Sequence, residues 1–366
     1  MPPQTRVAIT LEQFWHRVPG GTATAVWAMA RALAERDLDL VGVSAWNKTK
    51  PNVRFRLPFP IEWLPLPRVA LYPAWHRFRW PKVEAATGPV EVIHATTFAI
   101  PPKSAPLVVT IHDLAFLHSP EHFTARGRRF FERGLELALQ DADVVVCPSR
   151  HTADDCIANG FPRESIRVVP WGVEAVAVSE DEVADTLADF EITRPYILWT
   201  GTIEPRKNLA RLVEAFLSMD TDAELVLAGP HGWNEDLSQL LARGAGRIRS
   251  LGYVQPHDLA ALYSGASIVC YPSLLEGFGL PVLEAMAQGA PVVTSSGTAT
   301  EEAAGGAAAL VDPRDTRSIA EGMMELLDDR SKAELLGAAG RERAAELTWA
   351  SCAEQMHTVY DEVSHP

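Results

Sequence analysis

The sequence predicts an α/β protein made of two doubly wound domains, each built around a parallel β-sheet. Short apolar runs alternate with helical patterns through both halves of the chain, and this alternation is typical of stacked β-α units. The chain has 366 residues, of which 47% are hydrophobic, so it is long enough to form two cores. The expected strands are 7–10, 38–45, 90–95, 107–112, 142–148 and 166–170 in the first half, and 196–200, 224–228, 248–253, 267–271, 291–295 and 308–311 in the second.

Helical patterns occupy the connections between these strands. They are expected at 22–35, 125–140, 150–159, 209–217, 318–327 and 332–347. A linker near residues 171–182 separates the halves, so we expect an N-terminal domain at 1–175 and a C-terminal domain at 176–347. The remaining segment, 348–366, contains one more helical pattern at 350–363, which either caps the second domain or crosses back to the first.

The charge is unevenly distributed along the chain. The formal net charge is −14, but the first 175 residues amount to +3 and the rest to −17. An acidic protein of this kind is a poor nucleic-acid binder, so no nucleic-acid partner is expected. The mildly basic first half suits an anionic acceptor or a membrane surface.

Three further features favour a cytoplasmic protein. The sequence has no apolar run of 18 residues that would cross a membrane, and its first residues enter a strand pattern directly, without the apolar core of a signal peptide. The cysteines lie far apart in the sequence, so buried free thiols are expected rather than disulfides or metal ligands. They are Cys147, Cys156, Cys270 and Cys352.

Two glutamates follow the strand pattern at 267–271. Glu276 lies in the turn, and Glu284 lies about one turn inside a helix that Pro281 can begin and Gly289 can end. Both carboxylates are therefore expected at the carboxyl edge of a parallel sheet, where open α/β sheets bind ligands. Two such groups suit a ligand with several hydroxyls, such as a sugar and a ribose. A solvated acidic loop is the alternative.

Two basic residues follow the strand pattern at 196–200. Arg206 and Lys207 stand just ahead of the next helix pattern, which Asn208 can cap. Fixed cations beside a helix N-terminus form an anion site, and a diphosphate is the natural occupant. Such a site would stabilise the charge that grows on a departing nucleoside diphosphate. The alternative is a solvent-exposed basic loop.

Two loops of the first half also follow strand patterns. Gly20 and Gly21 precede a helix that Thr22 can cap, and glycines let a ligand approach the backbone closely, although a purely structural turn fits equally well. His112 and Asp113 lie at the carboxyl end of the strand pattern 107–112. A histidine there has either a structural role or a ligand contact.

These motifs carry a resemblance to a known family. The Glu-x7-Glu spacing of Glu276 and Glu284 resembles the signature of retaining nucleotide-sugar glycosyltransferases of family 4, and the Glu-Pro-Arg-Lys run at 204–207 and the Ile-His-Asp run at 111–113 resemble two more of its motifs. The resemblance is strongest at 107–113, 196–208 and 251–295 and weakest at 46–88. It implies the GT-B fold, in which two Rossmann-like domains face a central cleft and a C-terminal helix crosses back to the first domain.

The resemblance also implies roles for the candidate residues. Arg206 and Lys207 would grip the donor phosphates, Glu276 the transferred sugar and Glu284 the ribose. The residues implied as catalytic are His112, Asp113, Arg206, Lys207 and Glu276. The residues implied in donor binding are Gly20, Gly21, Thr202, Arg206, Lys207, Val254, Glu276, Gly277, Phe278, Gly279, Leu280 and Glu284.

The resemblance implies more specific roles for four of these residues. His112 would contact the sugar, and Asp113 would hold the histidine ring or contact the acceptor. Val254 would lie near the nucleotide base. Some family members carry an arginine where this chain has Thr202, so one phosphate contact is either missing or supplied from elsewhere.

The family's mechanism implies that the acceptor hydroxyl attacks on the face of the leaving group, with no enzyme nucleophile. The protein then supplies positioning and stabilises the leaving group. The arginine and lysine pair does the neutralising, so no metal or other cofactor is expected.

The stretch from Arg54 to Lys82 is unusual because it mixes aromatic and basic residues. It holds seven aromatic residues, six Arg or Lys and six prolines, and the prolines exclude one long helix. Three interpretations remain: a packed loop over the first domain, a lid that binds the acceptor, and a patch that docks peripherally on the inner face of the cytoplasmic membrane.

The sequence and the resemblance therefore predict a glycosyltransferase that uses a GDP- or UDP-sugar and retains the anomeric configuration. A mannosyltransferase-like enzyme of glycan or glycolipid synthesis is the expectation. The acceptor would be a glycan, a lipid-linked sugar or a small molecule. The alternatives are a sugar-nucleotide epimerase of the same fold and a non-catalytic sugar-binding protein.

Overall fold

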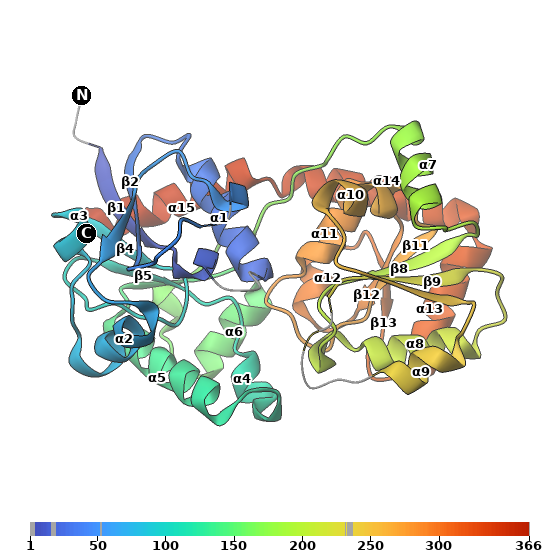
Figure 1. The fold of residues 1–366 in the computed structure, drawn as a ribbon, viewed down its shortest axis with the longest axis horizontal. Coiled ribbons are helices and arrows are strands. Elements are labelled where there is room, and N and C mark those ends of the chain that lie inside the picture. Colours follow the sequence, from blue (N-terminus) through green and yellow to red (C-terminus); the bar gives the residue numbers. More distant parts are fainter. Residues whose placement is uncertain (1–3, 16–19, 52, 231, 233–236, 366) are drawn as a thin grey trace. The chain divides into compact units, whose positions relative to one another are not determined.

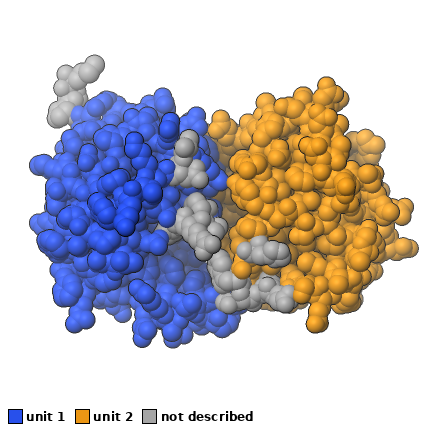
Figure 2. All heavy atoms as spheres, in the orientation of Figure 1, with its two compact units in different colours: residues 1–172, 349–366 blue, residues 173–348 orange. Residues whose placement is uncertain are grey.

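The computed structural model describes residues 4–15, 20–51, 53–230, 232 and 237–365. The chain forms two compact units: residues 1–172 with 349–366, and residues 173–348 (Figure 2). Each unit is an open parallel sheet covered by helices on both faces, which is the predicted α/β architecture (Figure 1). Among the described residues, no helix has the length and apolar character needed to cross a bilayer.

The first unit contains a seven-stranded sheet in the order β3-β2-β1-β4-β5-β6-β7, with every neighbouring pair parallel. Its strands are almost entirely buried in the centre, as expected for a parallel sheet covered on both faces. The strands are β1 Thr5–Thr10, β2 Leu38–Ala45, β3 Ile61–Leu64, β4 Val92–Ala95, β5 Leu107–Thr110, β6 Val144–Cys147 and β7 Ile166–Val168.

Alternate strand residues of this unit face two helical layers. Ala8, Ile93 and Val109 belong to a core cluster with residues of α2, η3, α5 and α6 on one face of the sheet. The longer helical elements of the unit are α1 Gly21–Leu33, α2 Arg68–Pro73, the π-helical turn η3 Ala74–Phe78, α5 Ala125–Asp141, α6 Arg150–Ala158 and α15 Trp349–Ser364. Shorter turns are η1 Glu12–Trp15, η2 Val53–Phe55, α3 Glu84–Thr87, α4 Ala115–His118, η4 Pro120–His122 and η5 Arg163–Ser165.

The last helix, α15, packs on α1, β1 and β4 of the first unit (Figure 1). It buries Met356 and Tyr360 completely. The Tyr360 hydroxyl lies 2.8 Å from Nδ1 of His94, and Nε2 of that buried histidine lies 2.7 Å from the Thr110 hydroxyl. Burial lowers the pKa of His94 to about 3, so the ring is a neutral link between the helix and the sheet.

The second unit contains a six-stranded parallel sheet in the order β10-β9-β8-β11-β12-β13. Helices α8 and α13 cover one face, and α10, α11 and α14 lie on the other (Figure 1). The strands are β8 Tyr196–Thr200, β9 Glu224–Ala228, β10 Ile248–Gly252, β11 Ile268–Tyr271, β12 Val292–Ser295 and β13 Ala309–Val311. The helices are α7 Glu180–Asp189, η6 Pro205–Lys207, α8 Leu209–Ser218, α9 Ser238–Arg243, α10 Pro256–Gly265, α11 Leu280–Ala287, α12 Ala299–Ala304, α13 Thr316–Asp328 and α14 Arg330–Glu346.

The strand order of each sheet reverses at one point, and open sheets bind ligands outside the carboxyl ends of the strands at such a point. In the second unit the reversal lies between β8 and β11, so the loops that follow these two strands meet there. In the first unit it lies between β1 and β4. The predicted site residues follow these strands or their neighbours, except Val254, which follows β10, two strands away from β8.

Two sequence expectations need correction. The sequence patterns did not reveal β3, a four-residue edge strand in the aromatic and basic stretch. The region 171–182 is not wholly a linker, because α7 begins at Glu180 and the reciprocal hydrogen bonds of Ser179 and Glu182 fix its start. The expectation for the cysteines is confirmed: all four are buried free thiols.

Candidate active site

Two cations of the second unit project from the turn after β8. Arg206 and Lys207 belong to η6, which directly precedes α8, as the sequence predicts. The Arg206 carbonyl accepts a 2.8 Å hydrogen bond from the Leu274 amide, so the turn after β8 is tied to the loop after β11. Asn208 holds the N-cap position, but it adopts the left-handed conformation and does not cap α8 with its side chain. Its buried amide instead donates to the carbonyls of Pro272 and Pro313.

The side chain of Lys207 is held by close packing. Its stem crosses Gly201, where an added Cβ would lie 2.9 Å from Nζ. Gly201 has a φ of +137°, which favours glycine. Nζ donates to the Tyr271 hydroxyl at 2.8 Å. The lysine is therefore held over the end of β8 and is only 12% exposed.

Glu276 lies between the two cations. Its Oε2 is 2.7 Å from Nη1 of Arg206, and its Oε1 is 3.8 Å from Nζ of Lys207 and 2.6 Å from the Tyr271 hydroxyl. Nη2 of Arg206 also pairs with Glu204 at 2.8 Å. Burial opposes ionisation of Glu276, but the Arg206 and Lys207 charges and the Tyr271 and Arg206 hydrogen bonds outweigh it and lower its pKa to about 2. Glu276 is therefore a carboxylate at neutral pH.

Glu284 is the fifth residue of α11 and lies at the same edge of the sheet. Its Oε2 accepts a 3.2 Å hydrogen bond from the Tyr263 hydroxyl, which is itself 2.8 Å from the Thr200 hydroxyl at the end of β8. Burial, followed by the charge of Glu284, raises the pKa of Tyr263 well above its usual range. The phenol therefore keeps its proton and fixes the carboxylate.

The loop between the two glutamates ends in a fixed turn. Gly279 occupies the N-cap of α11 with a φ of +112°, and a Cβ added there would lie 3.0 Å from the Thr300 side chain. Phe278 is buried beside it, and Leu280 is the first helical residue. Gly277 also belongs to this buried turn. Packing and backbone conformation together therefore require glycine at position 279.

Two other expected donor contacts lie in loops of the same edge. Thr202 is the second residue after β8 and is partly buried. Val254 follows β10 by one residue and is 8% exposed, whereas the neighbouring Tyr253 is 59% exposed. Each of the predicted residues of this unit thus lies at the carboxyl end of a strand or in the first turns of the helix that follows.

His112 and Asp113 follow β5 in the first unit. The Thr96 carbonyl lies 3.0 Å from Nε2 of His112, so Nε2 carries the proton and Nδ1 presents a lone pair. Burial lowers the pKa of His112, although the Thr96 hydrogen bond and the charge of Asp113 oppose this, so the ring is neutral. Asp113 accepts from the Ala115 amide at 3.0 Å. The carbonyl of Thr96, and not Asp113, therefore orients the ring.

Gly20 and Gly21 begin α1. Gly20 occupies the N-cap without a side-chain hydrogen bond, and Gly21 is the first helical residue. Thr22 is therefore not the cap that the sequence predicts. A Cβ at either glycine would meet no atom within 4 Å, and both glycines are exposed. The packing of the described residues does not demand glycine here, so the backbone of this helix start is open to a ligand.

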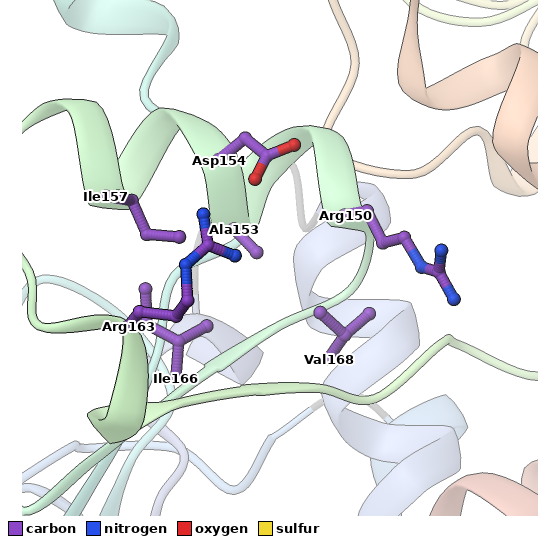
Figure 3. Close-up of a pocket in the computed structure, with 7 residues that line it drawn as sticks. All are labelled: Arg150, Ala153, Asp154, Ile157, Arg163, Ile166 and Val168. Carbon is purple, nitrogen blue, oxygen red and sulfur yellow. The ribbon is translucent and has the colours of Figure 1, made fainter.

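A cavity of about 420 Å³ lies on the first unit between α6 and β7. Ala153, Ile157, Ile166 and Val168 line it, with Arg163 lying across it beside Asp154 and Arg150 pointing away (Figure 3). None of the predicted site residues lines this cavity. The cavity is therefore separate from the predicted donor and acceptor residues.

Both halves of the chain are similar to known glycosyltransferase families. Residues 182–343 match the family described as glycosyl transferases group 1, and residues 19–176 match glycosyltransferase family 4. The O-antigen chain mannosyltransferase B of Escherichia coli is 34% identical over 280 residues, which are 74% of each chain. The chain belongs to glycosyltransferase family 4. It is a nucleotide-sugar glycosyltransferase of glycan synthesis, and neither the epimerase nor the sugar-binding alternative is favoured.

A second relative and two solved structures are also similar to this glycosyltransferase. An MMP alpha-(1->4)-mannosyltransferase of Mycolicibacterium hassiacum is 31% identical over 241 residues, which are 63% of this chain and 57% of the relative. Anabaena HepE in complex with UDP and glucose has a TM-score of 0.78 at 17% identity, covering 98% of this chain and 100% of HepE. Sucrose-phosphate synthase from Thermosynechococcus elongatus has a TM-score of 0.78 at 22% identity, covering 98% and 99%. These solved structures support the GT-B fold.

Sequence reasoning missed three residues that shape the site. Tyr271, Tyr263 and Glu204 contact Glu276, Glu284 and Arg206 directly. Glu204 was visible as part of the motif, and Tyr271 is a polar end to an apolar strand. No sequence pattern indicates a role for Tyr263 in the site, because only the packing of α10 against α11 brings it to Glu284.

Proposed function

We propose that this glycosyltransferase moves a mannosyl residue from a nucleoside diphosphate donor to a hydroxyl of a glycan acceptor, with retention of the anomeric configuration. The cluster of Arg206, Lys207 and Glu276 is the observation that carries this proposal. It combines two cations and an ionised carboxylate at the edge of a sheet where α/β proteins bind ligands. The mannosyl group is suggested by the two relatives named as mannosyltransferases.

Arg206 and Lys207 bind the donor diphosphate in this proposal. Both are already anchored, Arg206 by Glu204 and Lys207 by Tyr271, so little reorganisation is needed when charge develops on the leaving group. Preorganised cations of this kind stabilise a departing nucleoside diphosphate more than they stabilise the bound donor.

Glu276 and Glu284 accept hydroxyl hydrogen bonds from the two rings of the donor. Glu276, next to the cations, takes the transferred sugar, and Glu284, on α11, takes the ribose. Because the pKa of Glu276 is about 2, it has no proton to give at neutral pH. The carboxylate therefore positions the sugar, and the cations stabilise the leaving group. Neutral His112 contributes an acceptor at Nδ1 for a sugar hydroxyl.

Retention follows from attack on the leaving-group face of the sugar. The acceptor oxygen bonds to the anomeric carbon as the bond to the phosphate oxygen breaks, and that phosphate oxygen takes the acceptor's proton. This step needs positioning and charge stabilisation but no nucleophile from the protein. Proton NMR of the product tests it: the anomeric signal should have the configuration of the donor, and an inverted signal would contradict retention.

Neutralisation by Arg206 and Lys207 implies a metal-independent reaction. Activity should be unchanged after dialysis against EDTA, with the rate of nucleoside diphosphate release as the measurement. A strict requirement for Mg²⁺ or Mn²⁺ would count against the charge-neutralising pair.

A thermal-shift panel tests the donor. GDP-mannose, UDP-glucose, ADP-glucose and dTDP-glucose are compared at the same concentration, because a ligand that binds only the folded state raises the apparent stability. We expect GDP-mannose to give the largest shift. Stabilisation by another nucleotide sugar would reassign the base or sugar, and no shift with any of them would contradict the proposed function.

We also propose that the stretch from Arg54 to Lys82 makes a peripheral contact with anionic lipid at the cytoplasmic membrane. Part of the stretch is packed, since Phe55 and Trp75 are buried. Val69, Phe78 and Trp80 are 71%, 69% and 56% exposed, and the exposed side chains Arg68, Arg77 and Lys82 lie near them in sequence. Exposed apolar groups with cations suit the interface of an anionic bilayer.

Vesicle sedimentation tests the lipid contact. The protein should sediment with vesicles of phosphatidylcholine and phosphatidylglycerol more than with phosphatidylcholine alone. Replacing Phe78 and Trp80 together by Ser should weaken sedimentation, whereas replacing Leu335, exposed on α14 of the other unit, should not. Equal sedimentation of both variants with both vesicle types would contradict the contact.

A further inference from the structure

Tyr271 places a polar group at the end of a buried strand. Its side chain is fully buried, and the strand residues before it, Ile268, Val269 and Cys270, are apolar and equally buried. A hydroxyl removed from water costs free energy unless it forms hydrogen bonds. A phenylalanine would fill the same volume without that requirement, so the hydroxyl needs an explanation in its contacts.

The Tyr271 hydroxyl joins Lys207 to Glu276. It accepts from Nζ of Lys207 at 2.8 Å and donates to Oε1 of Glu276 at 2.6 Å. The two charged atoms are themselves 3.8 Å apart, which is too long for a direct hydrogen bond. An ammonium only donates and a carboxylate only accepts, so the single phenol proton must point to Glu276.

Each member of the cluster has a separate anchor. The stem of Lys207 packs on Gly201, and its Nζ also lies 5.4 Å from the centroid of the Tyr271 ring. Arg206 holds the other carboxylate oxygen of Glu276. Burial, followed by the charge of Glu276, raises the pKa of Tyr271 well above its usual range, so the phenol stays protonated. Tyr271 is thus the neutral link that sets the distance between one cation and the carboxylate.

We infer that Tyr271 is a positioning residue for sugar transfer, which holds the Lys207 ammonium and the Glu276 carboxylate in the relative position that the donor requires. The inference rests on the proposed roles of these two residues toward the diphosphate and the sugar. The anomeric carbon lies between these two parts of the donor. A small shift of one anchor against the other therefore misaligns the bond that breaks, and such errors act on kcat more than on KM.

Tyr271→Phe tests this inference, with Tyr196→Phe as the matched control. Tyr196 is also a buried strand tyrosine of the second unit, but its hydroxyl donates to the Leu262 carbonyl at 2.6 Å and contacts no predicted site residue. Tyr271→Phe should lower kcat for GDP-mannose by about tenfold to a hundredfold with a smaller change in KM, since the lost bonds involve charged groups. Tyr196→Phe should lower the Tm and leave kcat unchanged.

A double-mutant cycle separates positioning from packing. In a Lys207→Met background, Tyr271→Phe should have a smaller effect on kcat than in the wild type. Additive effects, or a kcat equal to the control's, would each overturn the inference.

The outcomes also separate this inference from the proposed function. If Lys207→Met keeps wild-type activity, the phosphate assignment fails. If Lys207→Met is inactive while Tyr271→Phe matches Tyr196→Phe, only the role of Tyr271 fails. Should Tyr271→Phe not fold, 3-fluorotyrosine at this position keeps the ring and weakens the oxygen as an acceptor, and an unchanged kcat in that protein overturns the inference.

Discussion

Lys207 is the cation on which the proposed chemistry depends most. It lies between β8 and α8, its stem passes over Gly201, and its Nζ donates to the hydroxyl of Tyr271 at the end of β11. The position of the ammonium therefore depends on the pairing of β8 with β11.

Replacing Lys207 by Met keeps the length of the stem and removes the charge. We expect kcat/KM to fall by about 10²- to 10³-fold, as when a preorganised group that stabilises transition-state charge is removed. Steady-state kinetics with GDP-mannose is the measurement. Lys103→Met is the control, since this exposed lysine pairs with Asp143 in the other unit. Equal rates for both variants would refute the assignment.

Gly201→Ala tests the packing that holds Lys207. The new Cβ would lie 2.9 Å from Nζ and 3.0 Å from Cδ of the lysine, and the φ of +137° adds backbone strain. Gly246→Ala is the matched control, with a φ of +82° and open space around the Cβ. Each variant should lose about 1–2 kcal/mol of stability. Only Gly201→Ala should also lower kcat/KM, and equal activity of the two proteins would show that the lysine does not depend on this contact.

At the scale of elements, strong apolar runs were predicted well and weak ones were not. The bounds of β2, β8 and β9 agree with the expected strands, because each is a buried run with clear ends. β3 was missed because it is a four-residue edge strand with two exposed residues, which gives little pattern. The N-cap of α8 was misjudged because Asn208 uses its amide to bridge two carbonyls of other loops.

The helix α15 should contribute strongly to the stability of the first unit. Met356 is fully buried on it, so Met356→Ala should cost about 2–5 kcal/mol of unfolding free energy. Urea denaturation with circular dichroism measures the change, and Glu354→Ala, at an exposed position of the same helix, is the control. A loss below 1 kcal/mol, on the order of an exposed substitution, would mean that the helix does not hold the unit together.

At the scale of the whole molecule, the sequence predicted an α/β protein with two parallel sheets, and the structure and the relatives confirm it. The alternation of strand and helix patterns along the sequence is enough to predict this architecture. The contacts inside each site are set by strand order, which brings the turn after β8 to the loop after β11 although about 70 residues separate Arg206 from Glu276.

Acid should destabilise the first unit because several of its histidines are neutral when folded. Burial lowers the pKa of His76 to about 4 and of His94 to about 3, below the value of about 6.5 in an unfolded chain. The unfolded state then binds more protons below pH 6.5, so stability is full above that pH and falls as the pH drops toward the folded values. Between the unfolded and the folded pKa, each such histidine should lower the free energy of unfolding by about 1.4 kcal/mol for each unit by which the pH falls.

Calorimetry between about pH 7.5 and pH 5 measures how the free energy of unfolding depends on pH. This range covers the titration of the histidines in the unfolded chain. His76→Gln should reduce the slope of stability against pH. A stability that does not change over this range would contradict the assignment of neutral buried rings.

The binding of a nucleoside diphosphate tests the central claim most directly. Isothermal titration with GDP and with UDP is carried out on the wild type, Lys207→Met and Lys103→Met. The account predicts that one nucleotide binds the wild type and Lys103→Met alike, and that Lys207→Met loses most of that affinity. Equal affinity in all three proteins would contradict a diphosphate site built from Arg206 and Lys207.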